Sequence, residues 1–149
     1  MAHEFKLKRM VEFHETDLAG IVHFSNFFRY MENAEHAFFR SLGLLIHESE
    51  PVAPGEPVLG WPRVHAECDY MRPLRFEDEF EVHVRVLEVK NRALVYEFVF
   101  TRLVPGPAEE VARGKVVAAC ITRDASSKGM KAIPLPKRIT DQIQAAPKP

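Results

Sequence analysis

Cysteine and long apolar runs are both scarce in this sequence. The chain has 149 residues but only two cysteines, Cys68 and Cys120, too few for a disulfide framework. Both lie in segments that read as strands, so we expect two buried free thiols. No apolar run approaches the roughly 20 residues that a membrane-spanning helix needs, and the N-terminal residues lack the apolar core of a signal peptide. These absences favour a cytoplasmic protein that does not contact a membrane.

A charge excess of one sign is also absent. The formal net charge is −1, whereas nucleic-acid-binding domains usually carry a strong basic excess, so we expect no nucleic-acid partner. The seven histidines form no pair at helix spacing beside a carboxylate, as a zinc protease would need. A glycine-rich phosphate loop and a Gly-x-Ser-x-Gly nucleophile elbow are missing as well. We therefore predict no metal and no bound cofactor.

Composition and length predict one globular domain. Hydrophobic residues make up 46% of the chain and charged residues 28%, which is ordinary for a soluble fold, and the length can bury one core. We expect a single domain over 1–149, with an irregular loop at about 44–62 and a C-terminal tail at about 134–149 that holds a short helix near Ile139 to Ile143. So long a loop is either functional or a plain surface connection, and both readings stay open.

The first third of the chain predicts a strand, a loop and a long helix. Residues 5 to 13 alternate as a strand with one apolar face does. From about Ser25 to Leu42, apolar residues recur at steps of three and four, as in an amphipathic helix, namely Phe27, Met31, Ala34, Phe38 and Leu42. Gly43 is well placed to end this helix in the left-handed conformation. The loop between strand and helix holds Asp17.

The rest of the chain predicts four consecutive antiparallel strands. The first covers about 63–71 and is followed by a bend. The next two, at about 79–86 and 94–100, form a hairpin with Lys90 and Arg92 at its tip. The last runs from about Val111 to Thr122. Because a helix with one apolar face should be wrapped by a sheet of this size, the expected class is α+β.

Two linked motifs stand in register on either side of the irregular loop. The first is Thr16-Asp17-x-x-Gly20-x-Val22-x-Phe24-x-Asn26-Phe27, followed by Arg29-Tyr30-Met31-Glu32 and Leu42-Gly43. The second is Val64-x-x-x-x-x-Tyr70-x-x-Pro73-Leu74-x-x-x-Asp78. Together they resemble the hydroxybenzoyl-CoA thioesterase family of the hotdog fold. The resemblance implies a five-stranded antiparallel sheet around a long central helix, with strand order 1-3-4-5-2. It also implies a homodimer or homotetramer that binds coenzyme A between subunits.

The resemblance assigns thioester hydrolysis to Asp17, as nucleophile or as general base. The chemistry is compatible, because a thioester carbonyl needs an attacking oxygen on one side and a donor on its own oxygen. Free amides at a helix start can supply the donor, and the resemblance points to the backbone N–H of Phe24. Without the family pattern, Asp17 would more simply be a cap or turn residue. Ser25 weakens that reading, because it can cap the helix itself.

Other residues near Asp17 are candidates for substrate binding. Gly20 would let the backbone approach the substrate closely, and Phe28 would help to line an acyl pocket. His23 is expected to line the pocket rather than to act in catalysis, because related short-chain enzymes carry their histidine one place later, where this chain has Phe24. His14 and Glu15 could tune the pKa of Asp17, although Glu15 could equally face solvent.

Coenzyme A, as part of the substrate, is expected to contact the hairpin tip. Lys90 and Arg92 match basic positions that contact its phosphates in some relatives, although a hairpin tip is also the usual place for solvated charge. Arg63, Arg72 and Arg75 are weaker candidates. The expected reaction is hydrolysis of an acyl- or aroyl-CoA to an acid and coenzyme A. The alternatives are a hotdog hydratase or dehydratase, which the Thr-Asp-x-x-Gly loop argues against, and a non-catalytic acyl-CoA-binding protein.

Overall fold

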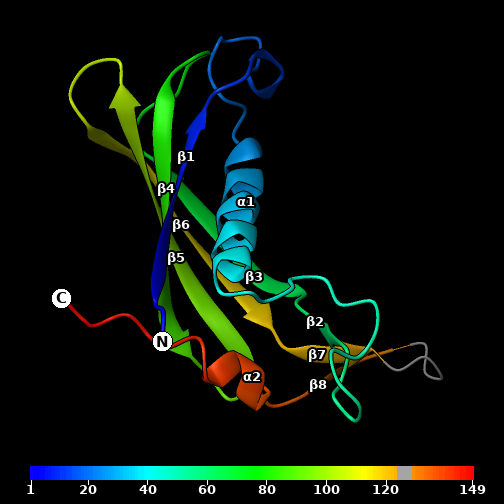
Figure 1. Ribbon diagram of the computed structural model, residues 1–149. Coiled ribbons are helices and arrows are strands. Elements are labelled where there is room, and N and C mark those ends of the chain that lie inside the picture. Colours follow the sequence, from blue (N-terminus) through cyan, green and yellow to red (C-terminus); the bar gives the residue numbers. More distant parts are fainter. Residues whose placement is uncertain (124–128) are drawn as a thin grey trace.

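A five-stranded antiparallel sheet wraps one long helix, α1 (Asn26–Ser41), in this computed structural model, which describes residues 1–123 and 129–149 (Figure 1). The strand order is β1-β4-β5-β6-β3. Counted along the chain through these five strands, that order is 1-3-4-5-2, so the α+β class and the hotdog topology are confirmed. The strands are β1 (Glu4–Met10), β3 (Arg63–Tyr70), β4 (Glu79–Val89), β5 (Ala93–Val104) and β6 (Glu109–Ala119).

The apolar stripe of α1 faces the inner side of the sheet, as its spacing predicts. Phe27, Met31, Ala34 and Phe38 are all buried, and each large apolar side chain buried in this way contributes roughly 1.5–3 kcal/mol. The helix lies close to β6, because a Cβ added at Gly114 would meet the Met31 Cε atom at 2.1 Å. At the end of α1, Gly43 adopts φ +72, the left-handed conformation expected of it.

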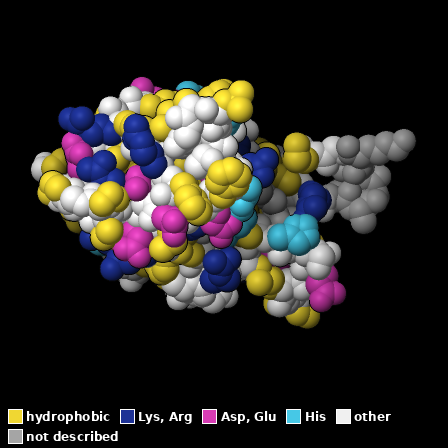
Figure 2. All heavy atoms as spheres, turned by 90° about the horizontal axis from the view of Figure 1, so that it is seen from above, with side chains coloured by type: hydrophobic (Ala, Val, Ile, Leu, Met, Phe, Trp, Pro, Cys, Tyr) yellow, Lys and Arg dark blue, Asp and Glu magenta, His cyan; other side chains and the backbone are white. Residues whose placement is uncertain are grey.

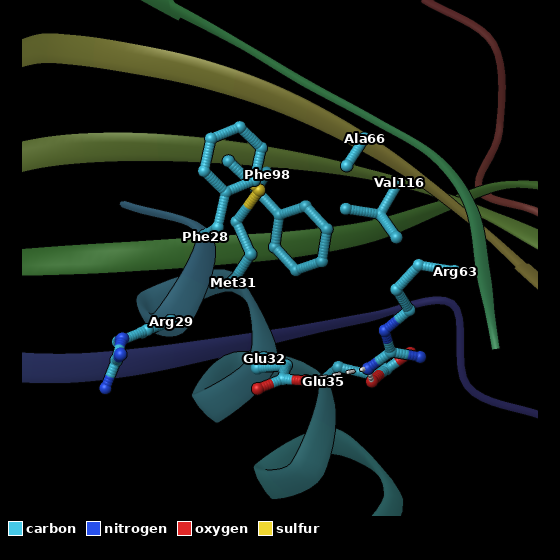
Figure 3. Close-up of a pocket in the computed structure, with 9 residues that line it drawn as sticks. All are labelled: Phe28, Arg29, Met31, Glu32, Glu35, Arg63, Ala66, Phe98 and Val116. Atoms are coloured by element: carbon cyan, nitrogen blue, oxygen red, sulfur yellow. Dashed lines mark hydrogen bonds and ion pairs between the residues drawn. The ribbon is translucent and has the colours of Figure 1, made fainter. Parts of the chain in front are cut away.

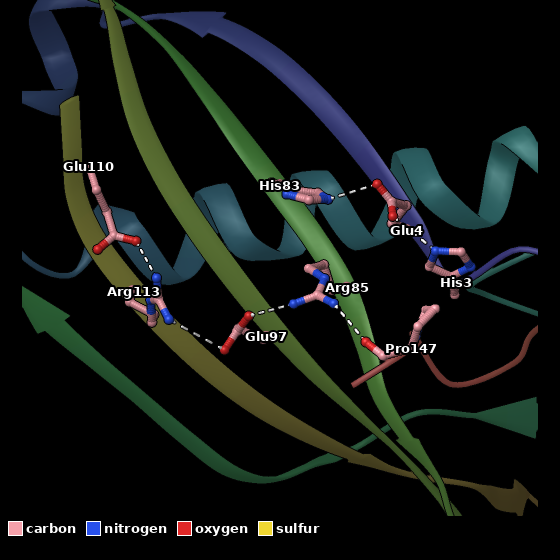
Figure 4. Close-up of polar contacts among 8 residues, drawn as sticks. All are labelled: His3, Glu4, His83, Arg85, Glu97, Glu110, Arg113 and Pro147. Carbon is pink, nitrogen blue, oxygen red and sulfur yellow. Dashed lines mark hydrogen bonds and ion pairs between the residues drawn. The ribbon is translucent and has the colours of Figure 1, made fainter. Parts of the chain in front are cut away.

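Charged side chains cover the outer face of the sheet. Arg85 on β4 and Arg113 on β6 both pair with Glu97 on β5, at 3.5 and 3.9 Å (Figure 4). Arg85 also donates to the Pro147 carbonyl at 3.3 Å, which ties the C-terminal residues to this face. Exposed ion pairs contribute only about 0–1 kcal/mol each, so their main consequence is a hydrophilic outer face.

The first strand ends earlier than its alternation predicts. β1 stops at Met10, and Phe13 begins a short 3-10 turn, η1 (Phe13–Glu15), with its ring 74% exposed. The chain turns here because the Glu12 N–H donates to the Glu15 side chain at 2.8 Å instead of to a neighbouring strand. Inclusion of Phe13 in the apolar face of the strand was therefore wrong.

The last predicted strand is broken at Cys120. β6 ends at Ala119, and β7 (Ile121–Arg123) enters a second small sheet with β2 (Leu59–Gly60) and β8 (Met130–Ala132). The break arises because the Cys120 N–H donates to the Arg92 carbonyl and the Cys120 carbonyl accepts from the Ile133 N–H. Both cysteines are free thiols, as expected, but Cys68 is only half-buried.

The irregular loop and the C-terminal tail are tied together. The buried Glu48 carboxylate accepts from the Leu59 N–H and from Arg138, both at 2.8 Å. Arg138 belongs to α2 (Lys137–Thr140), which begins and ends earlier than the helix expected near Ile139 to Ile143. This end of the molecule lies opposite the loop that carries Asp17 (Figure 1). Among the described residues, no helix is long and apolar enough to cross a membrane.

Candidate active site

The segment from Thr16 to Val22 is a tight closed loop between η1 and α1. Thr16 and Val22 pair as an isolated antiparallel bridge. Inside it, the Asp17 N–H donates to the Ile21 carbonyl at 2.8 Å, and the Gly20 N–H donates to the Asp17 carbonyl at 3.0 Å. Gly20 has φ +80, which side-chain-bearing residues adopt only with strain. This position therefore requires glycine for the turn itself, apart from any approach to substrate.

The Asp17 carboxylate uses one of its two oxygens to hold the loop. Its Oδ1 atom accepts from the Ala19 N–H at 2.8 Å and, more weakly, from the Ile21 N–H at 3.4 Å. Within the described parts of the chain, Oδ2 has no hydrogen-bond partner. The turn-residue role and the catalytic role are therefore compatible, because each can use a different oxygen of the half-buried side chain.

The backbone amide of Phe24, just before α1, is unpaired, because its N–H meets no acceptor among the residues that the structure describes. Ser25 occupies the N-cap position but forms no side-chain cap bond. Instead, the Ser25 N–H reaches the Nδ1 atom of His23 at 3.3 Å, and the Ser25 hydroxyl lies 2.8 Å from the same atom. His23 thus satisfies an amide that would otherwise be unpaired, and its ring stacks on Phe24 at 4.5 Å.

Asp17 and Phe24 face a common space. A hollow of about 610 Å³ lies between the loop, the first turn of α1 and the segment after β3. We call it the Asp17 hollow; Asp17, Phe24, Phe27, Tyr70 and Arg75 are among its lining residues. A second hollow of about 830 Å³ lies on the other side of the loop, where Gly20 and His23 join Asp17 and Phe24. At this end of the molecule, apolar, basic and acidic side chains are interspersed (Figure 2).

Tyr70 fixes the helix start, a role that the motif did not reveal. Its hydroxyl donates to the Phe24 carbonyl at 2.9 Å, and its ring meets Phe27 edge-on at 5.1 Å. Burial raises the pKa of Tyr70 to about 12, so the phenol stays protonated and remains a donor. Tyr70 therefore restrains Phe24, the residue whose amide is unpaired in the described chain.

A buried ion pair ties the loop to the helix from behind. Glu15 is only 7% exposed and pairs with Arg9 at 3.1 Å. Its carbonyl accepts from the His23 N–H at 2.9 Å and from the Asn26 side chain at 2.8 Å. A solvent-facing Glu15 was therefore the wrong alternative. The available signal was Arg9, a charged residue at an inward position of the β1 alternation, whose guanidinium lies 5.1 Å from the Tyr30 ring centroid.

Phe28 lines a different cavity, on the side of α1 that faces β3. This helix–strand pocket has a volume of about 220 Å³ and is drawn with its lining residues in Figure 3. Glu35, only 1% exposed, pairs there with Arg63 of β3. Burial raises the pKa of Glu35 to about 7, although the nearby Arg63 charge opposes the shift. Arg63, a weak candidate for coenzyme A, thus belongs to a buried ion pair.

Lys90 and Arg92 lie far from Asp17 within one chain. Asp17 is next to the beginning of β4, through the Ile21–Arg75 bridge, whereas the hairpin tip follows its end. β4 has 11 residues, which at about 3.3 Å per residue separates the two by roughly 35 Å. The basic residues beside Asp17 are Arg72, which pairs with Glu109, and Arg75. Residues 1–123 and 129–149 contain no cluster of three or more metal-ligating side chains.

Comparison with known proteins identifies the family of the chain. Residues 11–144 match the family model of the thioesterase-like superfamily. The chain belongs to this superfamily. A protein from Aquifex aeolicus (strain VF5) named "Putative esterase" is 32% identical over 140 residues, which cover 94% of this chain and 98% of that protein. Membership confirms the resemblance to hotdog thioesterases and the expectation of a thioester-hydrolysing enzyme.

Two further relatives cover nearly the whole chain. A 1,4-dihydroxy-2-naphthoyl-CoA hydrolase of Synechococcus elongatus is 26% identical over 141 residues, which cover 95% of this chain and 96% of that enzyme. The crystal structure of 4-hydroxybenzoyl-CoA thioesterase from Pseudomonas sp. strain CBS-3 matches with a TM-score of 0.80 at 22% identity, covering 95% of this chain and 99% of the other. At that identity the structural likeness shows a shared fold.

Proposed function

We propose that this protein hydrolyses an acyl- or aroyl-CoA thioester to the carboxylic acid and free coenzyme A. One observation carries the proposal: the Oδ2 atom of Asp17 and the N–H of Phe24 have no partner in the described chain, and both residues line the Asp17 hollow. They are an attacking group and a carbonyl donor, the two parts that acyl transfer needs. The naphthoyl-CoA hydrolases among the relatives support a coenzyme A ester as substrate.

Two chemical routes use the same residues. In the first, Asp17 Oδ2 bonds to the thioester carbon, the C–S bond breaks, and coenzyme A leaves as a thiolate that takes a proton from solvent; water then hydrolyses the acyl–Asp17 anhydride. In the second, Asp17 takes a proton from a water molecule, whose oxygen bonds to the same carbon; the C–S bond then breaks, and the departing coenzyme A thiolate takes the proton from Asp17. In both, the Phe24 amide donates to the carbonyl oxygen as negative charge develops there. The positive end of the α1 dipole assists it.

Coenzyme A binding involves residues of two kinds in this proposal. Arg75 lines the Asp17 hollow and forms no ion pair within the described residues, so it is placed to meet a phosphate of the same chain's substrate. Lys90 and Arg92 can reach that substrate only from a second subunit. Edge strand β3 supports such assembly, because it is unpaired on one side and its Val64 is 64% exposed. We therefore propose a homodimer or homotetramer with sites between subunits.

A thiol-trapping assay with a panel of aromatic and aliphatic acyl-CoA esters tests this function. The expected result is release of free coenzyme A from at least one ester, with the matching acid as the second product. A hydratase or dehydratase would change the acyl group but release no thiol. A binding protein would give saturable binding without any product. Either of those results would overturn the proposal.

A further inference from the structure

Apolar side chains line the contact between α1 and the edge strand β3, from Tyr70 near the Asp17 loop to Ala66 farther along the strand. We call this line of side chains the seam. Tyr70, Cys68 and Ala66 alternate along one face of β3, and Tyr70 contacts Phe27 of the helix. Burial raises the pKa of the Cys68 thiol to about 11, so it is neutral and behaves as a small apolar group. Phe27 lines the Asp17 hollow and the next residue, Phe28, lines the helix–strand pocket. The hollow and the pocket share no lining residue, but they adjoin consecutive residues of α1.

The far end of this seam is polar. In the helix–strand pocket, apolar side chains including Phe28, Phe98 and Val116 lie on one side, and Glu32, Glu35 and Arg63 gather on the other (Figure 3). Arg63 turns toward the helix because the β3–β6 register shifts between Arg63 and His65. It pairs with Glu35 and also approaches Glu32 at 3.7 Å.

Glu35 keeps an unused hydrogen-bonding atom in this polar end. Its side chain is 2% exposed, and the Oε2 atom has no partner within the described residues, while Oε1 is held by Arg63. A buried polar atom without a partner costs about 1–3 kcal/mol, and such atoms are rare unless something meets them. A hydroxyl group suits Glu35, because it can donate to a carboxylate and accept from a carboxylic acid. The pocket is lined by two acids, Glu32 and Glu35, and by two arginines, so its charges are balanced and a neutral hydroxyl group adds no unpaired charge.

The distance from Glu35 to the reaction centre sets the length of the acyl group that can reach both. Glu35 follows Phe24 by eleven residues, roughly 16 Å along a helix axis. Helical side chains lean toward the N-terminus, which leaves roughly 12 Å between the Phe24 amide and the Glu35 carboxylate. A single aromatic ring attached to the thioester is too short for this span. An extended chain of about ten carbons can cover it.

We propose that the seam binds an extended acyl chain and that Glu35, with Arg63, recognises a hydroxyl group at the far end of that chain. This inference rests on the proposed thioesterase function and names its substrate class as long-chain ω-hydroxyacyl-CoA. Glu35 is then a specificity-determining residue, and Asp17 remains the group that reacts.

Matched ester pairs test the inference. The long pair is 10-hydroxydecanoyl-CoA and decanoyl-CoA; the short pair is 4-hydroxybenzoyl-CoA and benzoyl-CoA. The wild-type protein is expected to prefer the long hydroxylated ester in kcat/KM by about tenfold or more, the usual effect of a hydrogen bond to a charged group. Glu35→Met should abolish or reverse that preference, because the hydroxyl then enters an apolar site without a partner. No Glu35-dependent preference is expected in the short pair.

A matched control separates recognition from general loss of a buried charge. Glu48 is 3% exposed and pairs with Arg138, so Glu48→Met removes a similar buried carboxylate outside the pocket. It should keep the wild-type preference. The wild-type ratio of kcat/KM for the two long esters tests the inference even if Glu35→Met does not fold.

The possible results separate this inference from the proposed function. Hydrolysis of both long esters at equal rates, or a Glu35-dependent preference in the short pair, would overturn the inference and leave the function standing. Tighter binding of 10-hydroxydecanoyl-CoA without thiol release from any ester would overturn the function, and the substrate class with it, while recognition of the hydroxyl group by Glu35 would remain. Neither binding nor hydrolysis of any ester would overturn both.

Discussion

Asp17 and Glu35 are two carboxylates in opposite surroundings. Asp17 lies in a loop, half-buried beside a hollow, with one oxygen held by backbone amides of its own turn and the other without a partner among the described residues. Glu35 lies in the middle of a helix, 1% exposed, and is held by a side chain from a distant strand. Backbone amides can thus position a carboxylate without enclosing it, whereas the buried carboxylate has a charged side chain as its partner. The first arrangement suits a group that must react, and the second suits a group that must recognise.

The largest effect is expected from Asp17→Asn. The variant should lower kcat about 1000-fold or more, because an amide can neither attack the ester nor accept a proton from water. The loop should persist, because the asparagine oxygen can still accept from the Ala19 and Ile21 amides. Thiol release and thermal unfolding measure the two properties. Asp141→Asn, which changes an exposed aspartate on the other end of the molecule, should retain wild-type turnover.

The second effect concerns the donor that works with Asp17. Phe24→Pro removes the free backbone N–H and should lower kcat about 100-fold or more. Position 24 precedes the N-cap residue Ser25, so this proline removes no hydrogen bond of the α1 ladder. Phe24→Ala keeps the N–H and removes only a 63% exposed ring, so its kcat should stay within about threefold of wild type. Equal losses in both variants would assign the effect to the ring and contradict the amide role.

The third prediction uses pH to test the burial of Glu35. Its folded-state pKa of about 7 lies above the ordinary value of 4.5, so the folded state holds this proton more tightly than the unfolded state. The resulting stabilisation is complete below pH 4.5 and is lost as the pH rises through 7. The free energy of unfolding of the wild type, relative to Glu35→Met, should fall by on the order of 3 kcal/mol across this window. Urea titrations of both proteins measure it, and a flat difference would contradict the burial.

The smallest effect is expected from Arg75, which is exposed in the Asp17 hollow. Arg75→Gln should raise KM for a coenzyme A ester about three- to fivefold at low salt, because an exposed charge pair contributes up to about 1 kcal/mol. The increase should shrink as salt screens the contact. Arg40→Gln, at the other end of α1, is the matched control. A KM that stays unchanged in Arg75→Gln while rising in Lys90→Gln would place the phosphates on the hairpin of another subunit.

Local patterns were sufficient to predict the elements that surround Asp17. The spacing from Phe27 to Leu42 and the glycine at position 43 predicted α1 and its end, because both depend on neighbouring residues. The alternation in β3, β4 and β5 predicted those strands for the same reason. The linked motifs brought Asp17 and Phe24 to attention, and the structure places both at one hollow.

Contacts between distant residues were not predictable from these patterns. The Arg63–Glu35 pair joins residues 28 positions apart, and the break at Cys120 depends on backbone partners at Arg92 and Ile133. Glu15 is buried because Arg9 reaches it from β1. In each case the local residue types favour a different environment from the one observed, and tertiary contacts determine where the residue lies.

One set of rates tests most directly whether Asp17 and Glu35 have separate roles in reaction and recognition. It consists of kcat/KM for 10-hydroxydecanoyl-CoA and for decanoyl-CoA in the wild type, Asp17→Asn and Glu35→Met. If Asp17 reacts and Glu35 recognises, Asp17→Asn lowers both rates by the same large factor and leaves their ratio unchanged, whereas Glu35→Met changes the ratio. A changed ratio in Asp17→Asn, or an unchanged ratio in Glu35→Met, would contradict this division.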